Sequence, residues 1–156
     1  MRNRWKAVKG DIFYAYLRPI KGSEQDGCRP VVVIQNNLGN KYSPTLIVAP
    51  LTEVLKKETL PTHIIIEKTG YLKYDSMILL EQIRTIDKCR LRNYVGRLKN
   101  SQIQEIDNAL IKTLSINIIG YLSSLGIGEN YNEKNEKLYS EYYNKQNWNE
   151  YKCWST

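Results

Sequence analysis

The sequence has one histidine and three cysteines among its 156 residues, which leaves few soft ligands for a metal. Cys28, Cys89 and Cys153 lie far apart and form no CxxC pair, so neither a zinc ribbon nor a disulfide framework is expected. The glycines match neither the GxGxxG pattern nor the phosphate-binding P-loop. We therefore expect no metal and no cofactor, with the cysteines as free thiols in a reducing compartment.

Long hydrophobic runs are also missing. No window approaches the roughly 18 to 20 apolar residues that a membrane helix needs. The basic N-terminus, MRNRWKAVKGD, lacks the apolar stretch and small-residue cleavage site of a signal peptide. The expectation is a cytoplasmic protein with no membrane partner.

Acidic residues are fewer than basic ones, and the net charge is +7 with a pI near 9.2. The excess of positive charge lies before residue 129, because acids and bases nearly balance in the remaining segment. A basic body favours a polyanionic partner such as nucleic acid, or an acidic protein.

Short β-branched and apolar runs separated by polar turns predict a mainly β domain, a small barrel or sandwich without interleaved helices. We expect a turn over 36–44. We also expect a bend or bulge between Ile83 and Ile86, because these two residues do not share a period-two face. Strands are expected over residues 11–17, 29–35, 45–51, 62–67, 76–80 and 94–98.

The periodicity changes after Asn100. Ser101 and Gln104 have the spacing of a capping box. Apolar residues then recur at steps of three and four, which predicts one face of an amphipathic helix: Ile103, Ile106, Leu110, Leu114 and Ile118. Gly120, Gly126 and Gly128 are expected to close this helix. From Glu129 onward, tyrosines alternate with lysines; this predicts either stacking on single-stranded bases or a loosely ordered extension.

The segment GSEQDGCRPVVVIQNN, residues 22–37, joins a polar loop to a run with the composition of a buried strand. Arg29 lies at the junction. Because loops held by a rigid scaffold often carry reactive groups, we hypothesise that this junction is the active site. The structural alternative is that Arg29 is a surface ion-pair partner.

RNA cleavage by the substrate's own 2′-hydroxyl suits a basic protein without a metal. It needs a proton acceptor, a proton donor and groups that stabilise the phosphorane. Arg29 fits the last role, and Thr52 could donate to a phosphate oxygen. Three candidates for the general base, Glu24, His63 and Glu81, cannot be ranked from the sequence, and His63 within a strand also suits a structural role.

Four segments resemble a known family. They read GDIFYAYLRPIKGSEQDGCRPVVVIQNN, SPTLIVAPLT, LPTHIIIE and DSMILLEQIRTIDKCRL, and they follow in unbroken order over about residues 8 to 118. In them the chain resembles the MazF/PemK toxins of bacterial toxin–antitoxin systems. The resemblance implies a mainly β, α+β fold: a small SH3-like β-barrel of the PemK/CcdB type with an amphipathic C-terminal helix over 8–120. Residues 121–156 would be an extension without a counterpart in the compact toxins.

The resemblance also implies an activity and partners. The protein would be a homodimer and a metal-independent, sequence-specific endoribonuclease that cleaves single-stranded mRNA, leaving a 2′,3′-cyclic phosphate and a 5′-hydroxyl. A cognate MazE-like antitoxin would insert an extended segment into the groove and block RNA. The alternatives are a non-catalytic toxin of the same fold that poisons a protein target such as DNA gyrase, and a plain RNA-binding barrel.

Site roles transfer by position within the matching motifs. Arg29 and Thr52 match the family's catalytic pair, with Arg29 stabilising the phosphorane and taking part in proton transfer. Ser23, Glu24 and Gln25 match the family's substrate loop, with Glu24 also a catalytic candidate, and Gln82 matches a base-contacting position. His63 and Glu81 are further candidates for substrate contact that rest on the residues alone. In the Kid/PemK branch, an acidic residue at the place of Glu81 acts as the base, assisted by an arginine two residues earlier. In this sequence the earlier residue is Leu79, so this mechanism does not transfer. Tyr16 replaces the Asp or Asn of many members, which could alter hydrogen bonding in the loop.

Overall fold

A computed structural model describes residues 6–53, 60, 62–68, 70 and 72–124. The chain divides into two compact units, residues 1–116 and residues 117–156. In the described part of the chain, the second unit contains the short helix α3 (Ile118–Ser124), and all strands belong to the first. Gly126, Gly128, Cys153 and the expectations for the segment from Glu129 onward lie outside the described residues.

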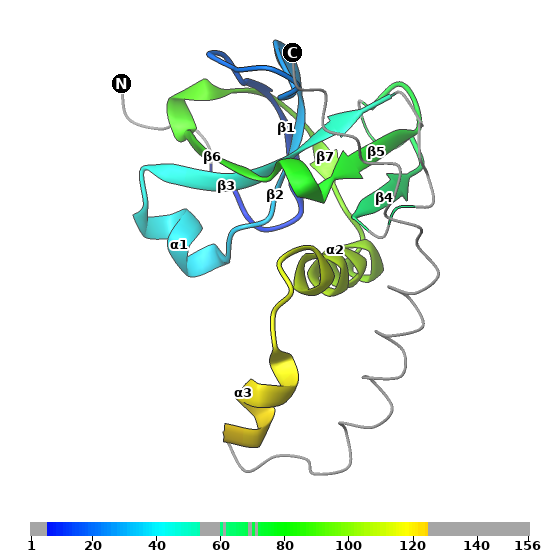
Figure 1. The fold of residues 1–156 in the computed structure, drawn as a ribbon. Helices are drawn as coiled ribbons and strands as arrows, with labels where there is room; N and C mark the ends of the chain where they lie inside the picture. Colours follow the sequence, from blue (N-terminus) through cyan, green and yellow to red (C-terminus); the bar gives the residue numbers. More distant parts are fainter. Residues whose placement is uncertain (1–5, 54–59, 61, 69, 71, 125–156) are drawn as a thin grey trace. The chain divides into compact units, whose positions relative to one another are not determined.

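Seven antiparallel strands form one sheet in the described residues, in the order β4-β5-β3-β2-β1-β7 with β6 paired to β3 (Figure 1). They are β1 (Asp11–Tyr16), β2 (Cys28–Val33), β3 (Thr45–Thr52), β4 (His63–Ile66), β5 (Ser76–Leu79), β6 (Arg84–Asp87) and β7 (Leu91–Arg97). The first five strands are confirmed to within two residues at each end. The last begins at Leu91, earlier than predicted, because two register shifts against β1 break its alternation.

β3 has partners on both edges. β2 pairs along one edge, while the other is shared by β6, opposite Thr45–Val48, and β5, opposite Leu51–Thr52. The gap between β6 and β5 falls at Ala49 and Pro50, and proline has no N–H to donate to a ladder. Between β5 and β6 the chain forms a 3-10 turn, η1 (Leu80–Gln82). The bend therefore precedes Ile83, and the prediction of a bend or bulge between Ile83 and Ile86 is wrong. A second 3-10 turn, η2 (Lys88–Arg90), leads into β7.

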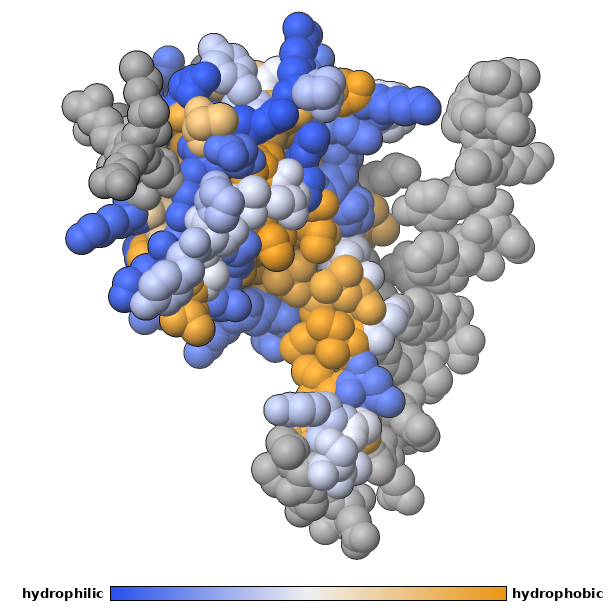
Figure 2. Space-filling view, turned by 90° about the vertical axis from the view of Figure 1, so that its left-hand side faces the viewer, coloured by the Kyte–Doolittle hydropathy of each residue, from blue (hydrophilic) through white to orange (hydrophobic). Residues whose placement is uncertain are grey.

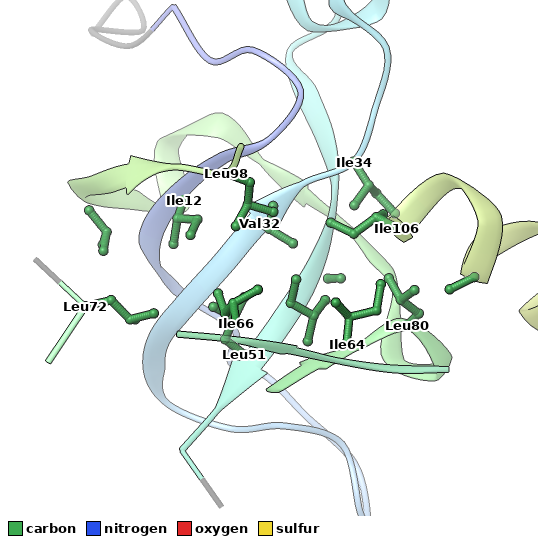
Figure 3. Close-up of a cluster of buried hydrophobic side chains, with 14 residues drawn as sticks. Ile12, Val32, Ile34, Leu51, Ile64, Ile66, Leu72, Leu80, Leu98 and Ile106 are labelled. Carbon is green, nitrogen blue, oxygen red and sulfur yellow. The ribbon is translucent and has the colours of Figure 1, made fainter. Parts of the chain in front are cut away.

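Hydrophobic clusters lie on both faces of the sheet. Val32 belongs to one cluster, and Val31 and Val33 belong to the other, so the β-branched run is buried on both sides as predicted. Figure 3 shows the first cluster, in which Ile34 points toward Ile106 of the helix that covers this face. Among the described residues, no helix contributes to the second cluster. There the curved sheet folds over itself, so that residues of β6 and β7 pack against residues of β1, β2 and β3.

The amphipathic helix is confirmed as α2 (Asn100–Thr113), packed on β4 and η1, but its ends differ from the prediction. At its start the Lys99 N–H donates to Gln102 Oε1 at 2.9 Å, so the capping residues are not Ser101 and Gln104. Its end comes at Thr113, because the backbone turns into the left-handed region at Ser115 (φ 50°). Ile118 and Gly120 therefore belong to α3.

The segment predicted as a turn contains a short helix, α1 (Asn37–Tyr42). Asn36 caps it, because its Oδ1 accepts a hydrogen bond from the Gly39 N–H at 2.8 Å. Asparagine favours helix caps for the same reason that it favours turns: its side chain bonds to nearby backbone.

The fold is α+β, mainly an antiparallel sheet, as predicted. The sheet curves strongly and has a barrel-like form (Figure 1), although no ladder joins β4 to β7 among the described residues. No helix in the described part of the chain is long and apolar enough to cross a membrane.

Candidate active site

The loop between β1 and β2 is closed at its neck by a continuation of the strand pairing. Tyr16 pairs with Cys28, and the Leu17 N–H then donates to the Gly27 carbonyl at 3.0 Å. One step further, Arg18 forms two hydrogen bonds to Asp26, at 2.8 Å from Nε and 3.0 Å from Nη2. These bonds hold the pKa of the Asp26 carboxyl below its usual range.

Arg29 follows the neck as the second residue of β2 and is half-buried. Its Nε donates to the Asp26 carbonyl at 2.6 Å, and its Nη1 donates to Gln25 Oε1. Both partners are loop groups without charge, so the guanidinium keeps its positive charge available to a phosphate. Arg29 therefore lies where the loop meets the strand, as expected, and its guanidinium contacts two groups of the loop.

Arg29 and Thr52 come to the same end of adjacent strands. The ladder between β2 and β3 ends with Val31 opposite Pro50. Continued by two residues, the same register would bring Arg29 opposite Thr52. Thr52 is half-buried and pairs with Met77 of β5 on its other edge. A cation and a hydroxyl on neighbouring strands, at the same end of each, are suited to contact one phosphate.

A cavity of about 500 Å³ is lined in part by Gln25, the residue that Arg29 Nη1 contacts; neither Arg29 nor Thr52 lines it. One wall is the loop, and the other is η1 with the start of β6. The walls consist of Lys21, Ser23, Glu24, Gln25, Pro50, Glu81, Gln82, Ile83 and Arg84.

Two contacts connect the walls. The Gln25 N–H donates to Gln82 Oε1 at 2.9 Å. Glu24 Oε2 lies 3.7 Å from Arg84 Nη1, which is an ion pair but too long for a hydrogen bond.

His63 lies behind Glu81 instead of facing the cavity. Its Nε2 is 3.1 Å from Glu81 Oε1, and its side chain is only 7% exposed, against 41% for Glu81. Of the three candidate bases, Glu24 and Glu81 therefore line the cavity, and His63 does not but contacts Glu81.

The structure thus brings together most of the residues singled out in the sequence. Ser23, Glu24, Gln25, Glu81 and Gln82 line one cavity, and Arg29 is bonded to its wall. Lys21, Pro50, Ile83 and Arg84 were not singled out. Arg84 could have been identified from the sequence as a candidate for phosphate contact, because it is a cation two residues after Gln82 in a basic protein.

Cys28 and Cys89 are free and exposed. Within the described residues, no three side chains among His, Cys, Asp and Glu gather closely enough to hold a metal ion.

Comparison with known proteins places this fold and cavity in a family. The pattern of the PemK-like, MazF-like toxin of type II toxin–antitoxin systems matches residues 8–114. An endoribonuclease MazF of Staphylococcus epidermidis is 54% identical over 110 residues, covering 70% of this chain and 92% of that protein.

Solved structures share the fold at low sequence identity. MazF of Deinococcus radiodurans (Form-I) aligns with a TM-score of 0.62 at 19% identity, over 72% of this chain and 99% of its own. A mycobacterial endoribonuclease in complex with its cognate antitoxin aligns with a TM-score of 0.59 at 20% identity, over 70% and 96%.

The family pattern covers well over half of the chain, and the staphylococcal relative matches across most of both sequences. The matched range contains the loop, Arg29, Thr52 and η1, and so the whole cavity. The chain belongs to the PemK-like, MazF-like toxins of type II toxin–antitoxin systems, and it is an endoribonuclease of that family.

Proposed function

We propose that this toxin cleaves single-stranded mRNA at a specific short sequence by transesterification, without a metal. The 2′-oxygen attacks the adjacent phosphorus, and its proton passes to a base on the protein. The bond from phosphorus to the 5′-oxygen breaks, and that oxygen takes a proton. The products are a 2′,3′-cyclic phosphate and a 5′-hydroxyl.

The observation that carries this proposal is the convergence of two distant segments on one cavity. Loop residues Ser23, Glu24 and Gln25 face Glu81 and Gln82 of η1 across a space of about 500 Å³. The loop side also holds Arg29. Polar groups converging on a cavity next to an oriented cation suit the binding of a nucleotide and its phosphate.

Arg29 and Thr52 would act on the phosphate. The Arg29 guanidinium would stabilise the phosphorane's charge and give the departing 5′-oxygen its proton. Thr52 would hold a non-bridging oxygen from the adjacent strand. Their roles are supported by the register that brings both to one end of β2 and β3.

Glu24 is our proposed acceptor for the 2′-hydroxyl proton. Its carboxylate lines the cavity and lies 3.7 Å from its nearest described ionic partner, Arg84, so its oxygens can accept a hydrogen bond. Glu81 already shares a hydrogen bond with His63, which favours a role in positioning the substrate. Gln82 would contact a base.

The proposed partners are single-stranded mRNA, a second copy of the chain and an acidic MazE-like antitoxin. The net charge of +7 suits the RNA and the antitoxin. A homodimer is supported by apolar surface exposed among hydrophilic side chains (Figure 2). The exposed apolar side chains of the first unit include Leu38, Tyr42, Ile47, Leu114 and Ile116. Messenger RNA as substrate suits a cytoplasmic location.

Cleavage of RNA in EDTA tests this function. Wild-type protein should shorten single-stranded RNA of varied sequence, and sequencing of the new 5′ ends should return one short motif. Arg29→Ala should fold normally and lose cleavage by at least about a hundredfold. Intact RNA with the wild type would overturn the proposal, and toxicity that survives Arg29→Ala and Thr52→Ala would point to a protein target.

A further inference from the structure

Arg18 and Asp26 form an ion pair at the neck of the active-site loop. They are cross-strand neighbours, two residues beyond the Tyr16–Cys28 pair in the register of β1 and β2. The pair is bidentate, with Nε and Nη2 of Arg18 at 2.8 and 3.0 Å from the two carboxylate oxygens. Such a fork fixes direction as well as distance.

The backbone of Arg18 is itself held. Nη1 of Arg90, at the end of η2, donates to the Arg18 carbonyl and, at 3.3 Å, to the Tyr16 carbonyl. One side of the neck is therefore attached to the body of the domain.

Asp26 connects this pair to Arg29. The Asp26 carbonyl accepts the hydrogen bond from Arg29 Nε at 2.6 Å, and Asp26 Oδ1 accepts one from the Gly27 N–H at 2.5 Å. Both polar groups of the Asp26–Gly27 peptide are thus hydrogen-bonded: its oxygen accepts from Arg29, and its N–H donates to the Asp26 carboxylate. Rotation of this peptide would break both bonds. Gly27 has a φ of 80°, a left-handed conformation that glycine adopts without strain.

We propose that Arg18 and Asp26 are positioning residues: their ion pair fixes the Asp26–Gly27 peptide, and this peptide directs the Arg29 guanidinium toward the scissile phosphate. The inference rests on the proposed function. It goes beyond the catalytic pair because Arg18 and Asp26 would act on the phosphate only through Arg29, by way of the Asp26–Gly27 peptide.

The effect should appear in catalysis and not in stability. The Arg18 side chain is 74% exposed, and exposed ion pairs contribute little to folding. Without the ion pair, Arg29 keeps its charge, but the Asp26 carbonyl that orients its guanidinium is no longer held in place. Misplacement of a catalytic group by a fraction of an ångström lowers kcat, so we expect a loss of about tenfold.

The test compares Arg18→Ala, Asp26→Ala and the double variant. Single-turnover cleavage of an RNA that contains the mapped site measures the chemical step. Affinity is measured with single-stranded DNA of the same sequence, which lacks the 2′-hydroxyl and is not cut. Each single variant should lose about tenfold in cleavage, with DNA affinity and melting temperature close to wild type. The double variant should lose no more than either single one, because both act through one contact.

Two further variants separate positioning from general electrostatics. Lys41→Ala removes one positive charge from α1, outside the loop, and should leave the cleavage rate of bound RNA unchanged. Asp26→Asn keeps an acceptor for the Gly27 N–H while losing the charge, so its cleavage should fall between wild type and Asp26→Ala.

Wild-type cleavage by Arg18→Ala and Asp26→Ala would overturn the inference. So would a loss confined to DNA affinity and its salt dependence, as expected for a cation that only attracts the backbone. Failure of the proposed function would look different: the wild type would not cleave, or Arg29→Ala would cleave as well as the wild type.

Discussion

The backbone N–H of Gln25 donates to Oε1 of Gln82 at 2.9 Å, although 57 residues separate the two in sequence. This bond ties the β1–β2 loop to η1 and so joins the two walls of the cavity. The donor is backbone and cannot be removed by substitution at residue 25. The side chain at residue 82 therefore decides whether the contact exists.

Gln82→Ala should loosen the loop. A net hydrogen bond of about 0.5–1.5 kcal/mol predicts that the Gln25 amide exchanges with solvent about two- to tenfold faster. Hydrogen exchange followed by NMR measures this directly. Gln82→Glu retains an acceptor and is the control, with exchange close to wild type. Unchanged protection of the Gln25 amide in Gln82→Ala would contradict the contact.

Glu24→Gln and Glu81→Gln provide a matched comparison for the general base, because each removes one carboxylate from the same cavity. If Glu24 accepts the proton, Glu24→Gln should lower cleavage by about a hundredfold or more and remove the acid limb of the pH–rate profile. Glu81→Gln should keep that limb and lose less activity. Single-turnover cleavage rates of both variants between pH 4 and 9 measure this difference. A larger loss in Glu81→Gln than in Glu24→Gln would identify Glu81 as the proton acceptor.

Asp11 should make stability depend on pH. Burial raises the pKa of its carboxyl above the ordinary 3.8, against the opposing effects of the Val8 N–H and Arg97. A raised pKa in the folded state means that this group's stabilisation is complete below about pH 3.8. It is lost as the pH rises through the folded-state value.

Asp11→Asn cannot ionise but can still accept from the Val8 N–H. Its melting temperature relative to wild type should therefore increase as the pH is raised above about 3.8. Thermal denaturation of both proteins below and above this pH tests the sign. Parallel curves would show that Asp11 has an ordinary pKa in the folded protein.

Ile106→Ala should strongly destabilise the first unit. Ile106 is 2% exposed within the cluster that α2 shares with the sheet, and truncation of such a side chain costs about 2–5 kcal/mol. Tyr74→Ala is the control, since Tyr74 is 60% exposed and should change stability by less than about 0.5 kcal/mol. Urea denaturation measures both variants, and equal effects would contradict the burial of Ile106.

Helix ends and turns were the parts of the fold that the sequence predicted least well. Ser101 and Gln104 had the right spacing for a cap, but the cap forms at Lys99, two residues after the end of β7. Leu114 and Ile118 continued the apolar period, yet the backbone leaves the helix at Ser115. Apolar spacing records which residues suit one helical face, whereas the end of a helix depends on backbone geometry.

The sequence by itself determined the first five strands, the doubly buried run of β2 and the segments that carry the site, but not β6 or the start of β7. Alternation and β-branching are local properties, and GSEQDGCRPVVVIQNN and LLEQIRTIDK are long enough to identify a family. Only the tertiary structure decided which side chains meet. The break in pairing beside Pro50 lets η1 lie against the loop. The register of β1 and β2 brings Arg18 and Asp26 together as an ion pair. Such contacts join residues far apart in the chain, and they exist only once the strands have paired.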